Sequence, residues 1–131
     1  MAPSPDAAAY SYSVLRIVPV IEREEFVNAG LILYCRERRY LAARGVLDET
    51  ALAALRPGGD VAAIRDQLRF VEAVAAGELT DGPLATMSQS ERFHWLTTPR
   101  STLVQPGPLH AGTTGDPGGA FEHLFGLLVT R

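Results

Sequence analysis

Strand-like hydrophobic patterns fill the first third of the chain. Runs rich in β-branched and aromatic residues alternate there with short charged segments, which is typical of strands joined by turns. We predict strands at residues 10–18, 26–35 and 40–46. The second run, FVNAGLILYC, is apolar at even and odd positions alike, so we expect both of its faces to be covered by other elements. The connectors favour antiparallel pairing and therefore a three-stranded meander.

The middle of the chain changes to helical spacing. Apolar residues recur at every third or fourth position through residues 61–74, with charged residues between them. Asp48 and Asp60 are placed as N-caps of two helices, and Gly77 is placed to close the second of them. Ser88 opens an S-x-x-E capping box, which predicts the start of a third helix.

A further strand and a last helix are predicted towards the C-terminus. Residues 101–105 (STLVQ) have strand character, and the Gly- and Pro-rich residues 106–115 are expected to form a loop. Asp116 followed by Pro117 is a helix-start signal. An apolar stripe at helical spacing follows, which predicts an amphipathic final helix. The stripe consists of Phe121, Leu124, Phe125 and Leu128.

The order of these elements, β-β-β-α-α-α-β-α, predicts an α+β fold. We expect an antiparallel sheet of about four strands with helices packed on one face. A chain of 131 residues has the length of one domain. Residues 1–9 hold two prolines and several alanines, so we expect them to be a disordered leader and residues 10–131 to form a single α+β domain.

Composition and charge exclude several classes of protein. The hydrophobic fraction of 47% and the charged fraction of 21% are globular values. The net charge of -3 makes a nucleic-acid partner unlikely on electrostatic grounds. The one cysteine, Cys35, permits no internal disulfide and fits a reducing compartment. The apolar runs are too short for a membrane span and no secretory signal is evident, so we expect a cytoplasmic protein with no membrane partner.

Common catalytic and cofactor motifs are missing from the sequence. It contains no P-loop, H-E-x-x-H, C-x-x-C, G-x-S-x-G or G-x-G-x-x-G motif. It also lacks lysine, which excludes Schiff-base catalysis on that side chain. No two of its 3 histidines have the spacing of metal ligands on one helix or strand. We therefore expect no metal and no cofactor, and whether the protein is an enzyme stays open.

Two polar residues interrupt the apolar strands of the first third. Arg16 stands within the first strand, where an unpaired buried guanidinium would be costly. It binds an anion in a pocket, makes a structural ion pair with the acidic residues of segment 22–25, or faces solvent from an edge strand. Asn28 either contacts a ligand or satisfies nearby backbone groups, and Gly30 suggests a bulge or a close backbone approach.

The segment 88–110 is rich in polar side chains. Arg92 and Arg100 carry planar guanidinium groups that suit bidentate binding of a carboxylate or phosphate, and with Arg16 they would form a three-arginine site. The alternative is that these side chains cap helices or face solvent. The candidate ligand-binding residues are Arg16, Asn28, Arg92, Arg100, Gln105 and His110.

Two long blocks of the sequence carry a family resemblance. They are residues 12–44, YSVLRIVPVIEREEFVNAGLILYCRERRYLAAR, and residues 90–112, SERFHWLTTPRSTLVQPGPLHAG. Together they resemble a bacterial family of small proteins, the domain-of-unknown-function family three-zero-three-seven. The family pattern R-G-E-F-V-N-V-G is matched at residues 23–30, with glutamate and alanine in place of the first glycine and the second valine. The resemblance implies no reaction, but it implies an accessory role, because members are often encoded beside a kinase-like protein similar to the HipA toxin.

Two functions follow as hypotheses. The first is a cytoplasmic interaction protein that binds a protein partner, such as a HipA-like kinase through the arginines at 36–39, or associates with itself, for example as a dimer. The alternative is a small enzyme or ligand-binding domain for an anionic substrate, with the arginines holding the anion, Asn28 orienting it and Glu25 as general base. DNA binding is less favoured, because the predicted helices are short and acidic.

Overall fold

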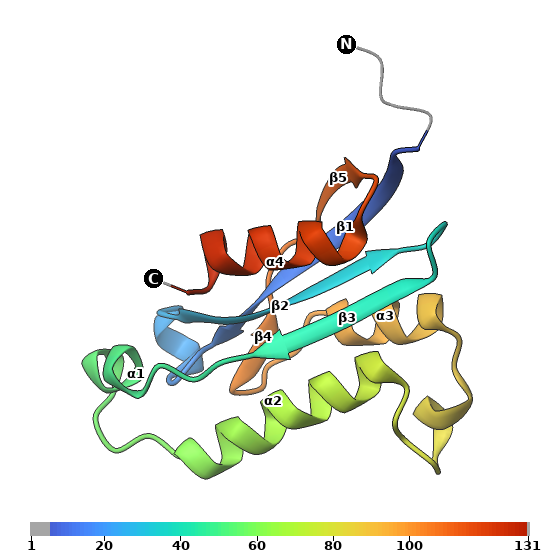
Figure 1. The fold of residues 1–131 in the computed structure, drawn as a ribbon. Coiled ribbons are helices and arrows are strands. Elements are labelled where there is room, and N and C mark those ends of the chain that lie inside the picture. Colours follow the sequence, from blue (N-terminus) through green and yellow to red (C-terminus); the bar gives the residue numbers. More distant parts are fainter. Residues whose placement is uncertain (1–5, 131) are drawn as a thin grey trace.

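A computed structural model describes residues 6–130 of the chain (Figure 1). The strands are β1 (Ala8–Ile17), β2 (Val27–Cys35), β3 (Tyr40–Gly45), β4 (Val104–Pro106) and β5 (His110–Thr114). The helices are α1 (Glu49–Leu55), α2 (Val61–Ala76), α3 (Gln89–Thr97) and α4 (Pro117–Leu128), with short 3-10 turns η1 (Ile21–Arg23) and η2 (Pro83–Thr86). The predicted leader lies largely outside the described residues, but β1 already includes Ala8 and Ala9, so the strand begins within it.

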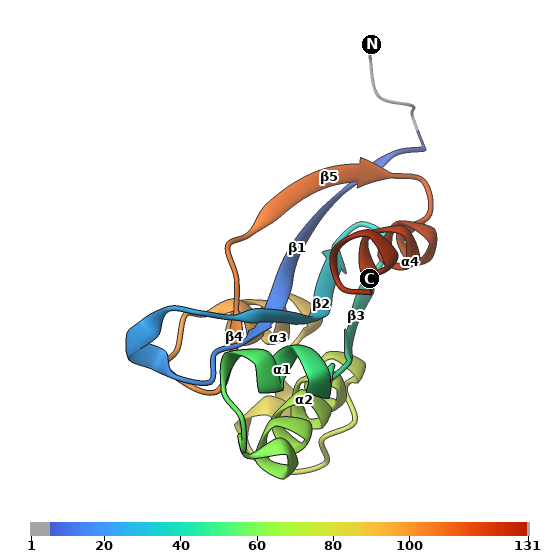
Figure 2. The same ribbon diagram turned by 90° about the vertical axis from the view of Figure 1, so that its left-hand side faces the viewer.

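β1 has neighbouring strands on both of its edges. β2 pairs with one edge and β3 pairs with β2, which confirms the predicted meander. The other edge is shared, since β5 pairs with residues 8–12 of β1 and β4 with residues 15–17 (Figure 2). Every pairing among the described residues is antiparallel, so the predicted α+β class with an antiparallel sheet is confirmed.

The strands near the C-terminus differ from the prediction. The strand expected at residues 101–105 begins only at Val104, and the expected loop at 106–115 contains β5, so the described sheet has five strands. β5 has the sequence HAGTT, whose small and polar residues give no hydrophobic alternation. Pairing with β1 holds it instead, and Gly112 leaves room for the Tyr10 ring, which would lie 2.5 Å from a Cβ at this position.

Helices cover both faces of the sheet (Figure 1). On one face Leu15 and Ile32 belong to a core shared with α1, α2 and α3. On the other face Leu31 packs with Phe121 and Phe125 of α4. The expected covering of both faces of β2 is confirmed, whereas the expectation of helices on one face has to be corrected for α4. The amphipathic stripe of α4 needs an apolar surface, and the alternate positions of β2 supply it.

A β-bulge shifts the alternation of side chains in β2. Leu15 lies opposite Gly30, but Arg16 lies opposite Asn28, so Ala29 has no partner of its own in β1. A Cβ at Gly30 would stand 2.5 Å from the backbone oxygen of Arg44 in β3, so only glycine fits this close approach. The bulge indicated by Gly30 is confirmed, and it places Asn28 beside Arg16.

The predicted helix ends are confirmed with one exception. The side chains of Asp48 and Asp60 accept hydrogen bonds from the first turns of α1 and α2. Ser88 forms the complete capping box at the start of α3, and Gly77 closes α2 with a φ of 72°. Asp116 precedes α4 as predicted, but its side chain makes no capping hydrogen bond.

Candidate functional site

Three of the candidate residues meet in one row across the sheet. Arg16 of β1 lies between two register partners, Asn28 of β2 on one side and Gln105 of β4 on the other. Residues directly opposite each other in a sheet point to the same face. That face is the one covered by α4, because the Asn28 amide donates a hydrogen bond to the backbone oxygen of Leu128 at the end of that helix (3.1 Å).

Arg16 lines an open cavity of about 420 Å³, whose other lining residues come from segments 18–26 and 101–105. We call this space, with its lining residues, the Arg16 cavity. Phe26 forms part of its wall, and the Arg16 Cζ lies 4.1 Å from the centre of the Phe26 ring. This geometry is that of a cation–π contact, which fixes the plane of the guanidinium. The lining residues are Arg16, Val18, Ile21, Glu24, Phe26, Ser101 and Gln105.

Arg16 is not neutralised by the described part of the chain. No carboxylate within residues 6–130 forms an ion pair with it. Its Nε is buried and has no hydrogen-bond partner there, although a buried N–H normally has one. Of the interpretations given to Arg16 from sequence, the structure therefore shows neither the ion pair with segment 22–25 nor an edge strand, since Arg16 has a strand on each side. The guanidinium keeps donors for an anion.

Gly107 leaves room for this position of Arg16. A Cβ at Gly107 would stand 3.1 Å from Nε and 3.2 Å from Cζ of Arg16. The glycine is held in place from both directions, since its N–H donates to the Val14 oxygen (2.9 Å) and its oxygen accepts from the fully buried Ser13 hydroxyl (2.9 Å). The site is thus built by β1 and the segment that joins β4 to β5.

The two neighbours of Arg16 in the row have different roles. The Asn28 amide ties β2 to the C-terminal end of α4, so it satisfies one of the orphan carbonyls of that helix. Gln105 lines the Arg16 cavity, and its amide nitrogen also donates to the backbone oxygen of Thr102 (2.9 Å). Asn28 therefore acts as a structural group, whereas Gln105 combines a turn contact with a place in the cavity wall.

Arg92 lies elsewhere and acts as a helix cap. Its Nε donates to the oxygen of Val74 and its Nη1 to the oxygen of Met87, each at 2.9 Å. Val74 belongs to the last turn of α2, and its oxygen also accepts a hydrogen bond from the N–H of Gly77 (3.1 Å). The capping alternative considered from sequence therefore describes Arg92.

Arg100 closes the C-terminal end of α3 in a similar way. Its guanidinium donates to the backbone oxygens of Trp95 and Thr98 and lies 4.3 Å from the centre of the Trp95 ring. Partial burial lowers the pKa of Arg100 from its ordinary value. Arg16, Arg92 and Arg100 line three different cavities, so the structure does not assemble the three-arginine site.

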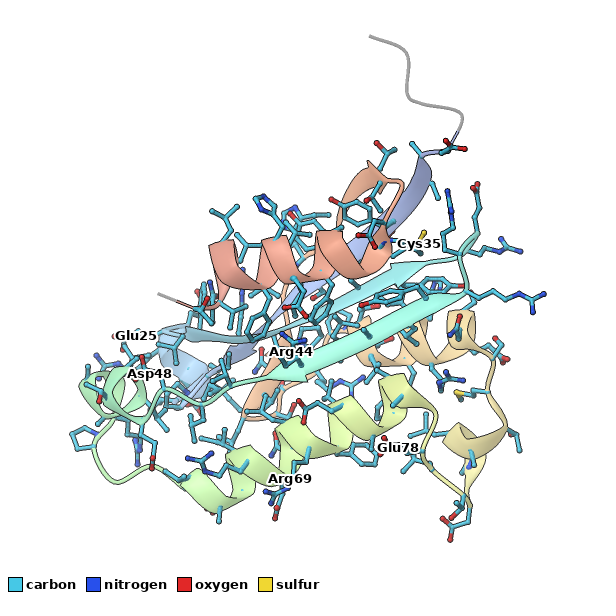
Figure 3. All side chains as sticks on the ribbon, in the orientation of Figure 1. Glu25, Cys35, Arg44, Asp48, Arg69 and Glu78 are labelled. Carbon is cyan, nitrogen blue, oxygen red and sulfur yellow. The ribbon has the colours of Figure 1, made fainter. Side chains whose placement is uncertain are left out.

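The remaining candidates also lie outside the Arg16 cavity. Glu25, the candidate general base, forms an ion pair with Arg23 and is not part of the cavity lining. His110 is exposed in β5 and packs against the ring of Tyr12, with centroids 5.2 Å apart. Figure 3 shows Glu25 at the end of the sheet near η1, with the buried Cys35 at the opposite end.

Other charged groups serve the fold or face solvent. Arg44 of β3 forms a bidentate ion pair with Glu122 of α4 and lies over the rings of Phe121 and Phe125, so it fastens this helix to the sheet. The arginines at 36–39 are exposed at the β2–β3 turn. Within residues 6–130, no group of three or more His, Cys, Asp or Glu side chains could hold a metal ion.

Of the cavity lining, sequence reasoning assigned only Arg16 and Gln105 to a ligand site. Glu24 was considered only as an ion-pair partner of Arg16, Phe26 and Ser101 were given no role of their own, and the need for Gly107 was not foreseen. Phe26 gave a usable signal, since it follows the charged connector and directly precedes the buried strand that contains Asn28. Nothing local distinguishes Ser101 or Gly107, whose roles depend on contact with β1.

A family model matches residues 12–129 and carries the description "Protein of unknown function (DUF3037)". This chain belongs to the DUF3037 family. The match includes both sequence blocks that carried the resemblance and every residue of the Arg16 cavity. Searches of the curated proteins and of the solved structures gave no match for this DUF3037 protein. None of the helices between residues 6 and 130 is long and apolar enough to cross a membrane.

Proposed function

We propose that this DUF3037 protein is a binding protein that holds an anionic group in the Arg16 cavity. The observation that carries the proposal is Arg16, which lines a cavity of about 420 Å³ and forms no ion pair among residues 6–130. A site of that volume is within the usual range for small ligands. The proposal assigns binding and not a reaction, because the candidate base Glu25 lies outside the lining.

Electrostatics support an anion as the occupant. A guanidinium binds carboxylates and phosphates through parallel hydrogen bonds, and such charge-assisted bonds are about twice as strong as neutral ones. The Phe26 ring and the backbone of Gly107 hold the group in one position, so little side-chain entropy remains to be lost when the ligand binds.

The arginine side chains give a direct test by nuclear magnetic resonance. Acetate and inorganic phosphate are titrated into the ¹⁵N-labelled protein, and the Nε–H signals of the arginines are followed. We expect the Arg16 signal to move with saturation, whereas the Arg92 signal stays fixed because that Nε–H already donates to Val74. Assignment comes from the variants Arg16→Met and Arg92→Met. The proposal is overturned if the Arg16 signal does not move with either anion at concentrations up to tens of millimolar.

A second candidate is the accessory role implied by the family resemblance. It is favoured by the exposed arginines of the β2–β3 turn, of which Arg36 and Arg39 make no side-chain hydrogen bond or ion pair among the described residues. We expect a HipA-like kinase partner to co-purify with the protein, and native mass spectrometry to show loss of the complex in the variant Arg36→Gln/Arg39→Gln. A kinase that stays bound to this variant would exclude the turn as the contact surface.

A further inference from the structure

Charges of both signs line the Arg16 cavity. Arg16 contributes the positive charge, and Glu24 is the acidic residue among the seven lining residues. Phosphate carries up to two negative charges, and a carboxylate in the same lining would repel it. A ligand with one carboxylate and one ammonium group would instead find an opposite charge for each. The lining therefore favours a zwitterion over a phosphate ester.

The backbone at Glu24 has a defined conformation at the end of η1. Glu24 ends η1 with a φ of 58°, in the left-handed region that side-chain-bearing residues seldom adopt. Its N–H donates to the Ile21 oxygen, so the turn is closed by hydrogen bonding. Its side chain is free of ion pairs among residues 6–130, because the adjacent Arg23 pairs with Glu25.

The rest of the lining is an apolar wall with two neutral polar groups. Val18 is almost fully buried, whereas Ile21 is 42% exposed and Phe26 is 43% exposed, which is high for side chains of this type. A ligand side chain that covers these two residues would remove apolar surface from water, which stabilises the complex. Ser101 and Gln105 complete the wall and offer hydrogen bonds.

From these contacts we infer that the Arg16 cavity binds an α-amino acid with an apolar side chain. Arg16 binds its carboxylate, Glu24 its ammonium group, and the wall of Val18, Ile21 and Phe26 its side chain. A volume of about 420 Å³ accommodates such a molecule. This inference rests on the proposed anion site at Arg16 and adds the identity of the ligand class.

Three small molecules separate the contributions of the two charges. L-leucine carries both charges, 4-methylpentanoate lacks the ammonium group, and 3-methylbutylamine lacks the carboxylate. Calorimetric or resonance titrations of the full chain are expected to rank L-leucine first. It should bind about tenfold or more tightly than 4-methylpentanoate, which corresponds to one hydrogen bond to a charged group. The amine alone should bind more weakly than L-leucine by a similar factor.

Two glutamate variants locate the ammonium site. Glu24→Gln is expected to bring L-leucine down to the affinity of 4-methylpentanoate. Glu22→Gln is the matched control, because Glu22 belongs to the same turn but lines a different cavity, and this variant should bind like the wild type. Thermal melting of each variant checks that the fold is retained.

The outcomes distinguish the inference from the proposed function on which it rests. Equal affinity of the wild type for L-leucine and 4-methylpentanoate overturns the amino-acid inference and leaves the anion site standing. The amino-acid inference also fails, and the anion site stands, if phosphate moves the Arg16 signal and L-leucine does not. If acetate, phosphate and L-leucine all leave this signal unchanged, both the inference and the proposed function fail.

Discussion

The backbone of Gly107 packs directly against the guanidinium of Arg16, although the two residues are far apart in the sequence. A Cβ at Gly107 would also stand 3.0 Å from the Val14 oxygen, which accepts the Gly107 N–H. Close approach of backbone and ligand-binding side chain is a usual reason for glycine at a strand end. The segment between β4 and β5 therefore positions the proposed anion-binding group.

Replacing Gly107 should damage the site and the sheet together. In Gly107→Ala the added methyl group has to displace either Arg16 or the β1 backbone, so we expect a loss of about 1–3 kcal/mol in the free energy of unfolding. Acetate should then no longer move the Arg16 Nε–H signal. Urea unfolding and the titration described above measure both effects. An alanine variant with wild-type stability and binding would contradict this account of Gly107.

Gly126→Ala is the matched control for that substitution. Gly126 is exposed within α4, and a Cβ there would meet nothing nearer than 4.0 Å. Alanine in a helix interior lowers the entropy of the unfolded chain relative to glycine, so we expect a gain of about 0.5–1 kcal/mol. Binding at Arg16 should be unchanged.

The bulge in β2 should be intolerant of any side chain at Gly30. The Cβ of Gly30→Ala would lie 2.5 Å from the Arg44 oxygen and 2.9 Å from Cδ1 of Leu15. Backbone atoms of β3 cannot move aside cheaply, so we expect destabilisation of about 3 kcal/mol or more, at the severe end for single substitutions. Chemical denaturation measures it. Retention of wild-type stability would show that β3 can shift away from β2.

Arg92 should matter for stability and not for binding. Arg92→Met keeps much of the side-chain volume but leaves the oxygens of Val74 and Met87 without these donors. Loss of such bonds costs about 1–3 kcal/mol in the free energy of unfolding. Affinity for acetate at Arg16 should match the wild type, which is measured in the same titration. Weakened anion binding in a folded Arg92→Met protein would point back to a shared arginine site.

The ion pair between Arg44 and Glu122 predicts a specific response to acid. The Arg44 guanidinium lowers the pKa of Glu122 below its ordinary value of 4.5. A carboxyl whose pKa is lower in the folded state stabilises the protein above its unfolded pKa, and this contribution is lost as the pH falls through the folded pKa. We expect Glu122→Gln to melt below the wild type near neutral pH and to converge with it in acid.

Glu78→Gln serves as the control for the acid prediction. Glu78 follows the end of α2 (Figure 3) and is an exposed carboxylate without an ion pair among the described residues, whereas Arg44 and Glu122 join β3 to α4. The melting temperatures of the wild type and Glu78→Gln should change with pH in the same way from neutral pH to about pH 3. If the melting temperature of Glu122→Gln also follows that of the wild type over this pH range, the ion pair adds nothing to stability.

Local chemistry explains which parts of the fold the sequence predicts. Asp48 and Ser88 cap helices through hydrogen bonds to residues three positions ahead, so their signals are complete within a few residues. β5 has no such local signal, because its strand conformation depends on pairing with β1 at the other end of the chain. The apolar pattern of β2 predicted that both faces of the sheet are covered, but it did not indicate that α4 covers the second face.

The candidate site shows the same division. Arg16 could be singled out because a guanidinium within an apolar strand needs an explanation. Arg92 and Arg100 looked equally suited to an anion, and only the folded chain shows that backbone oxygens already occupy them. Whether an arginine keeps donors for a ligand depends on which carbonyl oxygens lie near it in the folded chain. Tertiary packing brings carbonyl oxygens at the ends of α2 and α3 to Arg92 and Arg100.

The shared edge of β1 has a consequence for synthesis of the protein. β2 and β3 follow β1 closely, but β4 and β5 leave the ribosome only after the whole helical middle of the chain. During that interval one long edge of β1 presents unpaired N–H and C=O groups to any other strand nearby. A nascent or truncated chain that ends before β4 therefore exposes a template for aggregation, and pairing of β4 and β5 with β1 removes it.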